Sequence, residues 1–215
     1  MWVAKFEFDG KNVFFGEAAN KFNVTITGYP ISSYEKNRQL YLNLIGTVKG
    51  DHEKKLELIK FLKKSKPIIN LEENNDFLNI LITEDKNFKL FYSPFFIYLS
   101  PVLIDNKGIY HYHIGSWRRQ EITNLIKFIE QNYQLNLKSL KQEKIQNISI
   151  LGFQPNLTKK QKNAYESAVK NGYYEYPKSI ELKDLAKLSK ISYSTFRQHL
   201  KYAEKKIGEF FIGKY

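Results

Sequence analysis

Apolar residues near the C-terminus follow the spacing of two short helices joined by a tight turn. Five of them recur at short, regular steps on either side of a polar break, and these are Leu185, Ala186, Ile191, Phe196 and Leu200. Steps of three and four residues place side chains on one face of a helix. Ile191 is expected to fill the turn, and Ser192 to cap the next helix with a hydroxyl that accepts a backbone N–H. The pattern predicts a helix-turn-helix whose second helix begins near Tyr193.

A third helix is predicted just upstream of this pair. Thr158 can cap its start, and Asn171-Gly172 is a typical stop. The apolar stripe of this helix consists of Ala164, Tyr165, Ala168 and Val169. An aromatic connector, 173–177, then leads to the next helix near Ile180, and its tyrosines are expected to lie in a shared core rather than to contact phosphate. Together these segments predict a unit of three helices.

The outer face of the helix that begins near Tyr193 carries side chains suited to DNA. They are Tyr193, Ser194, Thr195, Arg197, Gln198 and Lys201. Arginine and glutamine can bind guanine and adenine edges in a bidentate manner, hydroxyls can contact either base, and lysine or tyrosine can bind phosphates. The alternative is that any soluble helix needs a polar face. His199 lies next to the apolar Leu200 and is expected to pack at the rim rather than to contact a base.

The C-terminal residues also resemble a known family. The run 157–161, the segment Gly172-Tyr-Tyr-Glu-Tyr-Pro177 and the run Ile191-Ser-Tyr-Ser-Thr-Phe-Arg-Gln-His-Leu200 are similar to the helix-turn-helix domain of the archaeal bacterio-opsin activator family. The resemblance implies a DNA-binding transcriptional regulator. Lys190 departs from the pattern, because such domains often have glycine at this turn position. If the turn needs a positive φ, Lys190 carries strain.

Residues 1–154 alternate between strand and helix periods and predict an α+β domain. The first half is a strand, a helix and two paired strands, at 40–48, 51–64, 67–71 and 77–83. A second half repeats this plan with strands at 95–104 and 108–114, a helix at 119–132, and a hairpin of 135–140 with 145–151. The repeat predicts an α/β sandwich of two ferredoxin-like or ACT-like halves that share a sheet. Residues 155–215 would follow as an all-α helix-turn-helix domain.

Charge supports a nucleic-acid partner for the C-terminal part. The chain has a net charge of +12, and residues 155–215 carry 13 basic and 6 acidic residues, which is +7 of that total. A basic surface gives salt-dependent affinity for DNA, although RNA and acidic membranes attract it too. The longest apolar stretch, 91–104, is interrupted by Pro94 and Pro101, and the start 1–8 is charged and alternating, unlike a signal peptide, so neither a membrane span nor a leader is expected. The absence of cysteine excludes disulfides and thiolate metal sites and fits a cytoplasmic protein.

The chain contains no recognisable catalytic motif. A glycine-rich phosphate loop, a Gly-x-Ser-x-Gly elbow and a His-Glu-x-x-His zinc motif are all missing from the sequence, so we expect neither an enzyme nor a cofactor. One anion or ligand site is suggested by Ser116, Arg118 and Arg119, which precede a predicted helix. The alternative is a plain helix cap with Trp117 buried and both arginines solvated.

Two further groups of polar residues have structural explanations that we favour over chemistry. His111 and His113 share one face of a predicted strand, which is the spacing of a metal pair, but no third ligand is evident and we expect no metal. Asp9, Asp51 and Glu53 could act as acids or bases, yet carboxylates in loops and first helical turns are normally solvated or capping.

The sequence therefore predicts a sequence-specific transcriptional regulator that binds double-stranded DNA in the major groove. Its N-terminal domain would bind a small-molecule effector or mediate dimerisation, and a homodimer would also bury the apolar tail 210–212 if the first helix does not. Two alternatives stay open. One is a metabolite-binding or enzymatic α+β domain with a nucleic-acid-binding tail, and the other is a general RNA or chromatin binder.

Overall fold

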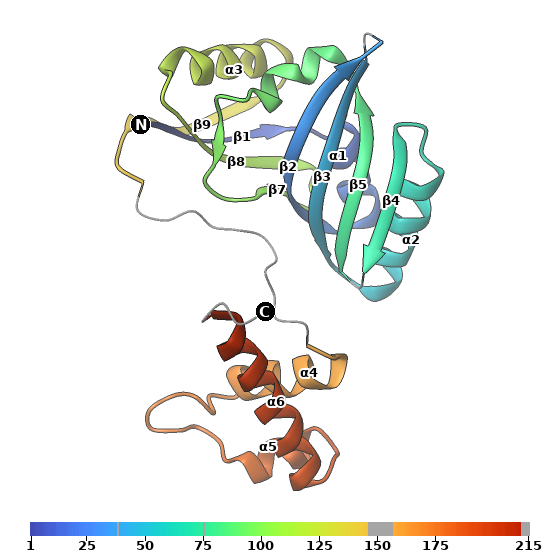
Figure 1. Cartoon of the computed structure of the whole chain (residues 1–215), viewed down its shortest axis with the longest axis vertical. Coiled ribbons are helices and arrows are strands. Elements are labelled where there is room, and N and C mark those ends of the chain that lie inside the picture. The colour runs from blue at the N-terminus through green and yellow to red at the C-terminus, as the bar shows by residue number, and fades with distance from the viewer. Residues whose placement is uncertain (38, 75, 146–156, 212–215) are drawn as a thin grey trace. The chain divides into compact units, whose positions relative to one another are not determined.

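The chain divides into two compact units, residues 1–152 and 153–215. The structure is a computed structural model, and it describes residues 1–37, 39–74, 76–145 and 157–211 (Figure 1). The boundary predicted from the sequence, between residues 154 and 155, lies outside the described residues. Each unit has its own hydrophobic core, so each is described separately below.

The N-terminal unit is built on one antiparallel sheet (Figure 1). The strands in the described residues are β1 (Trp2–Asp9), β2 (Thr25–Lys36), β3 (Gln39–Lys49), β4 (Ile68–Asn74), β5 (Phe77–Glu84), β6 (Ile97–Tyr98), β7 (Val102–Ile104), β8 (Ile109–Ser116) and β9 (Leu135–Gln142). Their order across the sheet is β4-β5-β3-β2-β7-β8-β1-β9, and β6 pairs with β8 beside this path. β1 is therefore an interior strand, and β2 and β7 lie at the middle of the sheet.

Helices cover one face of this sheet. They are α1 (Phe14–Phe22), α2 (His52–Lys64), the 3-10 helix η1 (Lys86–Tyr92) and α3 (Arg119–Asn132). Alternate strand residues point toward them, because successive side chains of a strand lie on opposite faces. Phe6 and Phe8 of β1 stack on the cross-strand partners Tyr112 and Tyr110 of β8, with ring centroids 5.1 and 4.9 Å apart. The strands and helices thereby share a single core.

The sheet consists of two halves with the same strand order. β3 and β4 are both antiparallel to β5, which lies between them, and α2 connects them. β8 and β9 likewise flank β1 and are connected by α3. Each half is a split β-α-β unit of the kind found in ferredoxin-like folds. The prediction of an α+β fold with two strand-and-helix halves that share a sheet is confirmed.

Several details of the predicted halves were wrong. The middle strand of the second half is β1, from the chain's beginning, which pairs with β9 from Trp2↔Gln142 onward. Of the predicted strand 145–151, Ile145 is not in a strand and the other residues lie outside the described part of the chain. The single strand predicted at 95–104 is divided into β6 and β7. Pro101, which cannot donate to a ladder, stands between them. α1 and β2 were not predicted.

The C-terminal unit consists of α4 (Lys159–Lys170), α5 (Leu182–Leu188) and α6 (Tyr193–Phe211). Its small core contains one cluster of buried residues, which are Ala164, Ala168, Leu185, Ala186, Phe196 and Leu200. Thr158 and Gln161 form a capping box at the start of α4, and Gly172 follows its end with a φ of 74°. The predicted three-helix unit is confirmed.

Some residues predicted to be apolar contacts of this unit lie at its surface. Val169 and Ile191 are 52% and 40% exposed. Ile191 does not fill the turn with its side chain, because the backbone closes the turn instead and Ile191 N–H donates to the carbonyl of Ala186 at 3.2 Å. Of the connector tyrosines, Tyr173 packs on the core, but Tyr176 is fully exposed. The small alanines of α4 and α5 explain why these predicted core residues are exposed. They let the helices cross closely, and such a crossing leaves little core to fill.

Lys190 has a φ of 52°, so the turn does require the left-handed conformation that favours glycine. We predict that Lys190→Gly stabilises the C-terminal unit by about 1 kcal/mol, because the side chain's steric penalty disappears. The matched substitution Lys187→Gly, in the helical backbone of α5, should instead destabilise it by about 1 kcal/mol. Urea unfolding of the full chain, followed by helical circular dichroism, measures both. If both substitutions changed the free energy of unfolding in the same direction, Lys190 would not be strained.

Candidate nucleic-acid interface

The start of α6 is fixed by a cluster of hydroxyl groups. Thr195 N–H donates to Ser192 Oγ at 3.2 Å, which is the predicted N-cap. Ser192 Oγ also lies 3.0 Å from Ser194 Oγ and 2.8 Å from Thr195 Oγ1. These contacts hold the first turn of α6 and place two of the predicted DNA-contacting side chains, Ser194 and Thr195, in defined positions.

One stripe of α6 presents polar side chains on the side turned away from its buried residues. Successive residues of a helix are about 100° apart, so Ser194, Arg197, Gln198 and Lys201 lie within one narrow sector. All four are exposed, whereas Phe196, Leu200 and Ala203 on the opposite side are at most 3% exposed. Tyr193, 47% exposed, and the half-buried Thr195 flank the stripe on its two sides. α6 therefore brings four of the six predicted residues onto one outward stripe, and Tyr193 and Thr195 lie at its margins.

The stripe is cationic. Arg197 and Lys201 have no hydrogen bond or ion pair with any other part of the chain that the structure describes, so their donors point to solvent. Lys205 continues the stripe one turn further and forms an exposed ion pair with Glu209 at 3.6 Å. The sequence interpretation missed Lys205, although its four-residue step from Lys201 could have indicated it. No acidic residue interrupts the sector between Ser194 and Lys205.

Polar contacts from the rest of the unit hold α6 in place. The Tyr174 hydroxyl donates to Glu204 Oε1 at 2.7 Å, and burial together with this carboxylate raises the pKa of Tyr174. Lys206 Nζ donates to Gln161 Oε1 at 3.2 Å, which ties α6 to the capping box of α4. Both contacts lie C-terminal to Lys201, so they orient the helix without occupying the surface of Ser194, Arg197, Gln198 and Lys201.

The comparison with known families agrees with this geometry. Residues 157–209 match the family model of a helix-turn-helix DNA-binding domain of the bacterio-opsin activator type. This segment is a helix-turn-helix DNA-binding domain. The match begins just before α4 and ends near the end of α6, so it includes all three helices and the stripe. No curated protein matches the chain. The resemblance predicted from the sequence is confirmed, and a DNA-binding role in transcription follows from it.

The residues of the suggested anion site lie at the start of α3. Ser116 is fully buried, and its Oγ accepts the backbone N–H of Arg118 at 3.1 Å. The guanidinium of Arg118 stacks on Phe95, 4.0 Å from the ring centroid, and that of Arg119 stacks on Trp2 at 4.7 Å. The two guanidinium groups are thus held by different rings. Trp117 is 79% exposed, so the alternative in which it is buried was wrong.

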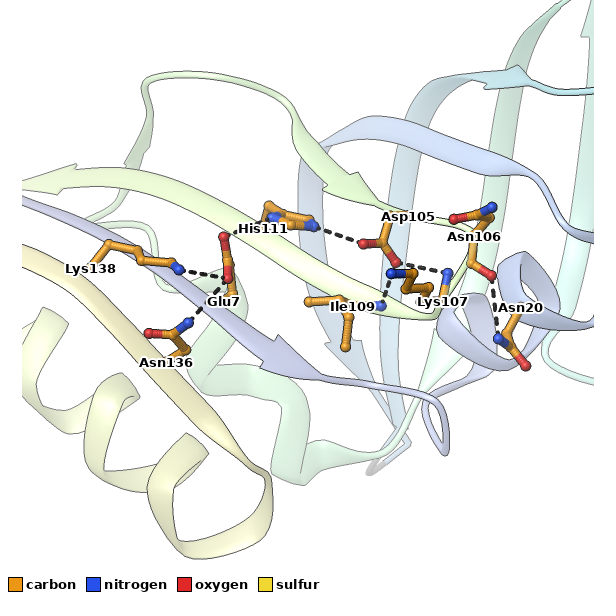
Figure 2. A network of polar contacts seen from close by, with 9 residues as sticks. All are labelled: Glu7, Asn20, Asp105, Asn106, Lys107, Ile109, His111, Asn136 and Lys138. Atoms are coloured by element: carbon orange, nitrogen blue, oxygen red, sulfur yellow. Dashed lines mark hydrogen bonds and ion pairs between the residues drawn. The ribbon is translucent and has the colours of Figure 1, made fainter.

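Figure 2 shows how His111 is engaged on the sheet face that the helices leave open. Its Nδ1 lies 3.3 Å from Glu7 Oε1, and its Nε2 lies 3.2 Å from Asp105 Oδ2. Because the two nitrogens point in opposite directions, the carboxylates do not converge on one ion. Lys138 and Asn136 hold the other oxygen of Glu7 at 3.2 and 3.3 Å. No group of three or more potential metal ligands occurs in the described residues.

At Asp105, hydrogen bonds lower the pKa of the carboxyl by more than burial raises it. Burial raises the pKa of this carboxyl, but the N–H groups of Ile109 and Lys107, together with His111, lower it overall. Asp51 likewise has a structural role, because it caps α2 by accepting the N–H of Glu53 at 2.9 Å. These polar residues hold turns and helix ends together.

None of the described helices is long and apolar enough to cross a membrane.

Proposed function

We propose that this chain is a non-enzymatic, sequence-specific transcriptional regulator that contacts bases in the major groove with the first half of α6. The exposed, cationic stripe of Ser194, Arg197, Gln198 and Lys201 is the observation that carries this proposal. A recognition helix contacts bases mainly from its N-terminal half, which is where these residues lie. The family match supports DNA as the partner.

Each side chain of the stripe has a role that its chemistry suits. Arg197 can bind O6 and N7 of a guanine with two parallel hydrogen bonds, and Gln198 can bind N6 and N7 of an adenine. Ser194 and Thr195 can contact base edges or phosphates with their hydroxyls. Tyr193 and Lys201, at the two ends of the segment, are suited to phosphates. Base contacts then supply the sequence preference, while phosphate contacts position the helix.

Two partners complete the proposal. We infer a homodimer, because helix-turn-helix proteins commonly bind two half-sites one helical turn apart. We also infer that the N-terminal unit receives a small-molecule signal, and the cluster of Ser116, Arg118 and Arg119 is one candidate site for an anion. The regulator would act in the cytoplasm, where it meets its DNA.

The base-contacting roles of Arg197 and Gln198 can be tested with DNA selected by the full chain from a random pool. Replacing either residue with alanine should cost about 1–3 kcal/mol on the selected site, which is roughly a fivefold to hundredfold weaker Kd, while binding to random DNA stays nearly the same. Fluorescence anisotropy at fixed salt measures both affinities. The specificity ratio should therefore fall with each substitution.

Lys201→Ala is the matched control on the same stripe. Loss of a phosphate contact should weaken selected and random DNA alike and reduce the salt dependence of binding by about one counterion. If all three variants lowered both affinities equally, the residues would not distinguish bases and the sequence-specific role would be wrong. If no selected sequence emerged and binding depended steeply on salt, a general RNA or chromatin binder would be the better explanation.

A further inference from the structure

The inner face of the sheet has a gap at its middle. Four residues lie side by side in register across β7, β2, β3 and β5, and these are Val102, Gly28, Gly46 and Leu78. The two central members have no side chains, so the row is bare between Val102 and Leu78. The rows above and below are filled by larger residues, such as Ile26 opposite Val48.

The close approach of the two strands requires glycine at both central positions. A Cβ added at Gly28 would lie 2.7 Å from the carbonyl oxygen of Ile45, and one at Gly46 would lie 2.8 Å from that of Thr27. Backbone atoms cannot move aside as a flexible side chain can. Glycine inside a strand often marks a place where a ligand can approach the backbone closely.

A cavity of about 80 Å³ lies over the glycine pair. Phe15 of α1, Leu62 of α2 and Tyr92 at the end of η1 line it from the helical layer, and Tyr110 and Tyr112 line it from β8. Its lining is mainly apolar, contains no charged side chain in the described part of the chain, and is partly open to solvent. Such a site excludes ions, because an unpaired charge in apolar surroundings loses its hydration without compensation.

Two hydroxyl groups in this lining are free to bind a ligand. Tyr110 Oη already accepts the N–H of Gly16 at 3.1 Å, and the neighbouring Tyr98 donates to the carbonyl of Phe91 at 2.6 Å. Tyr92 and Tyr112, in contrast, have no hydrogen-bond partner for their hydroxyls among the described residues. Burial raises the pKa of both phenols, so they remain protonated and can donate. Neither hydroxyl oxygen is among the buried unpaired side-chain atoms of the described residues, so both keep contact with solvent, and the polar group of a ligand can take the place of water there.

We propose that the N-terminal unit binds a small uncharged molecule over the Gly28–Gly46 pair, with an apolar body of about one ring and a polar group bound by Tyr92 or Tyr112. A dry cavity of about 150 Å³ holds benzene, so the 80 Å³ here encloses only part of one ring, the rest of which extends through the open side, and the space excludes a nucleotide. A mainly apolar pocket with a few polar groups is the usual form of a small-molecule site. The site is separate from Ser116, Arg118 and Arg119.

Phenol and toluene are matched probes for this site, since they have the same shape and differ in one hydroxyl. With the full chain, both should raise the melting temperature of the N-terminal unit, phenol at lower concentration, whereas benzoate should have no effect. The double variant Tyr92→Phe, Tyr112→Phe should weaken phenol binding about tenfold in calorimetry and leave toluene binding unchanged. The two substitutions keep the rings and remove only the hydroxyls, so folding is preserved.

A filled cavity provides the second test. Val102→Phe places a ring in the gap and should abolish binding of both probes, while Leu103→Phe, the next residue on β7 and on the opposite face of the sheet, should leave binding intact. Absence of any effect of phenol and toluene up to solubility would overturn the proposal. So would equal loss in the Val102 and Leu103 variants, or a phenol affinity that the tyrosine variants do not change.

Discussion

Replacing Phe196 with alanine is expected to unfold the C-terminal unit and to abolish DNA binding, while the N-terminal unit stays folded. Phe196 is fully buried in a core that contains only seven buried hydrophobic residues in the described part of the C-terminal unit. Truncation of a buried phenylalanine costs about 3–5 kcal/mol. A unit of this size has about 3–5 kcal/mol of stability in total. The substitution therefore removes nearly all of it.

Because the two units have separate cores, Phe196→Ala should unfold only the C-terminal unit. The N-terminal core contains no residue of the C-terminal one, so thermal unfolding of the variant should lose one transition and keep the other. Circular dichroism at 222 nm follows the helical transition, and anisotropy on the selected DNA follows binding. Tyr202→Ala, an exposed aromatic substitution on the same helix, should change stability by less than about 1 kcal/mol. A Phe196 variant as stable as the Tyr202 variant would contradict this packing.

Glu84→Gln is expected to stabilise the N-terminal unit at pH 8 by on the order of 3 kcal/mol and to have almost no effect at pH 4. Glu84 ends β5, opposite the buried Leu40, and the described residues provide no hydrogen bond or ion pair for its carboxylate. Burial, and secondarily the charge of Asp85, raises the pKa of Glu84 to about 7. The neutral form is therefore favoured inside the folded unit.

The direction of the effect follows from proton binding. In the unfolded chain the pKa of this carboxyl is about 4.3, so between that value and about 7 the folded state holds more protons than the unfolded state. The contribution of the Glu84 carboxyl to the stability of the natural protein is therefore greatest below about pH 4.3. It is lost as the pH rises through the folded pKa. Glutamine resembles the protonated acid and does not titrate, so its advantage appears only at higher pH.

Urea unfolding of the full chain at pH 4, 6 and 8 measures this difference. Glu130→Gln is a suitable control, because Glu130 is exposed on α3 and its replacement should give the same small change at every pH. A Glu84 variant whose stability runs parallel to the natural protein between pH 4 and pH 8 would show that the carboxylate is charged and solvated in the fold. The control distinguishes this outcome from a general effect of net charge.

The C-terminal unit could be predicted almost completely, because its signals are local. Thr158, Asn171-Gly172 and Ser192 mark helix ends within a few residues of the helices they limit. Side-chain exposure was harder to predict. Val169 and Ile191 fit apolar periods but lie at the surface, since the alanines at the helix crossing leave a core too small to take them.

The N-terminal unit was less predictable because its pairings are distant in sequence. The repeat of strands and helices could be recognised from periods within each half. The place of β1 could not, because Phe6 and Phe8 indicate an apolar strand face without indicating a partner. The cavity was missed for the same reason. Gly28 and Gly46 are unremarkable in the sequence, and only the register of four strands places them side by side.

The interior position of β1 has a consequence for synthesis on the ribosome. β1 is made first, but its nearest partner residue in β8 comes 100 positions later, where Asp9 pairs with Ile109, and its other partner, β9, is later still. Until then Phe6 and Phe8 have no strand on which to stack. Folding that depends on such distant pairings is slow and exposes apolar surface to aggregation. The helix-turn-helix domain is held by local contacts, so it can fold soon after its own three helices are made.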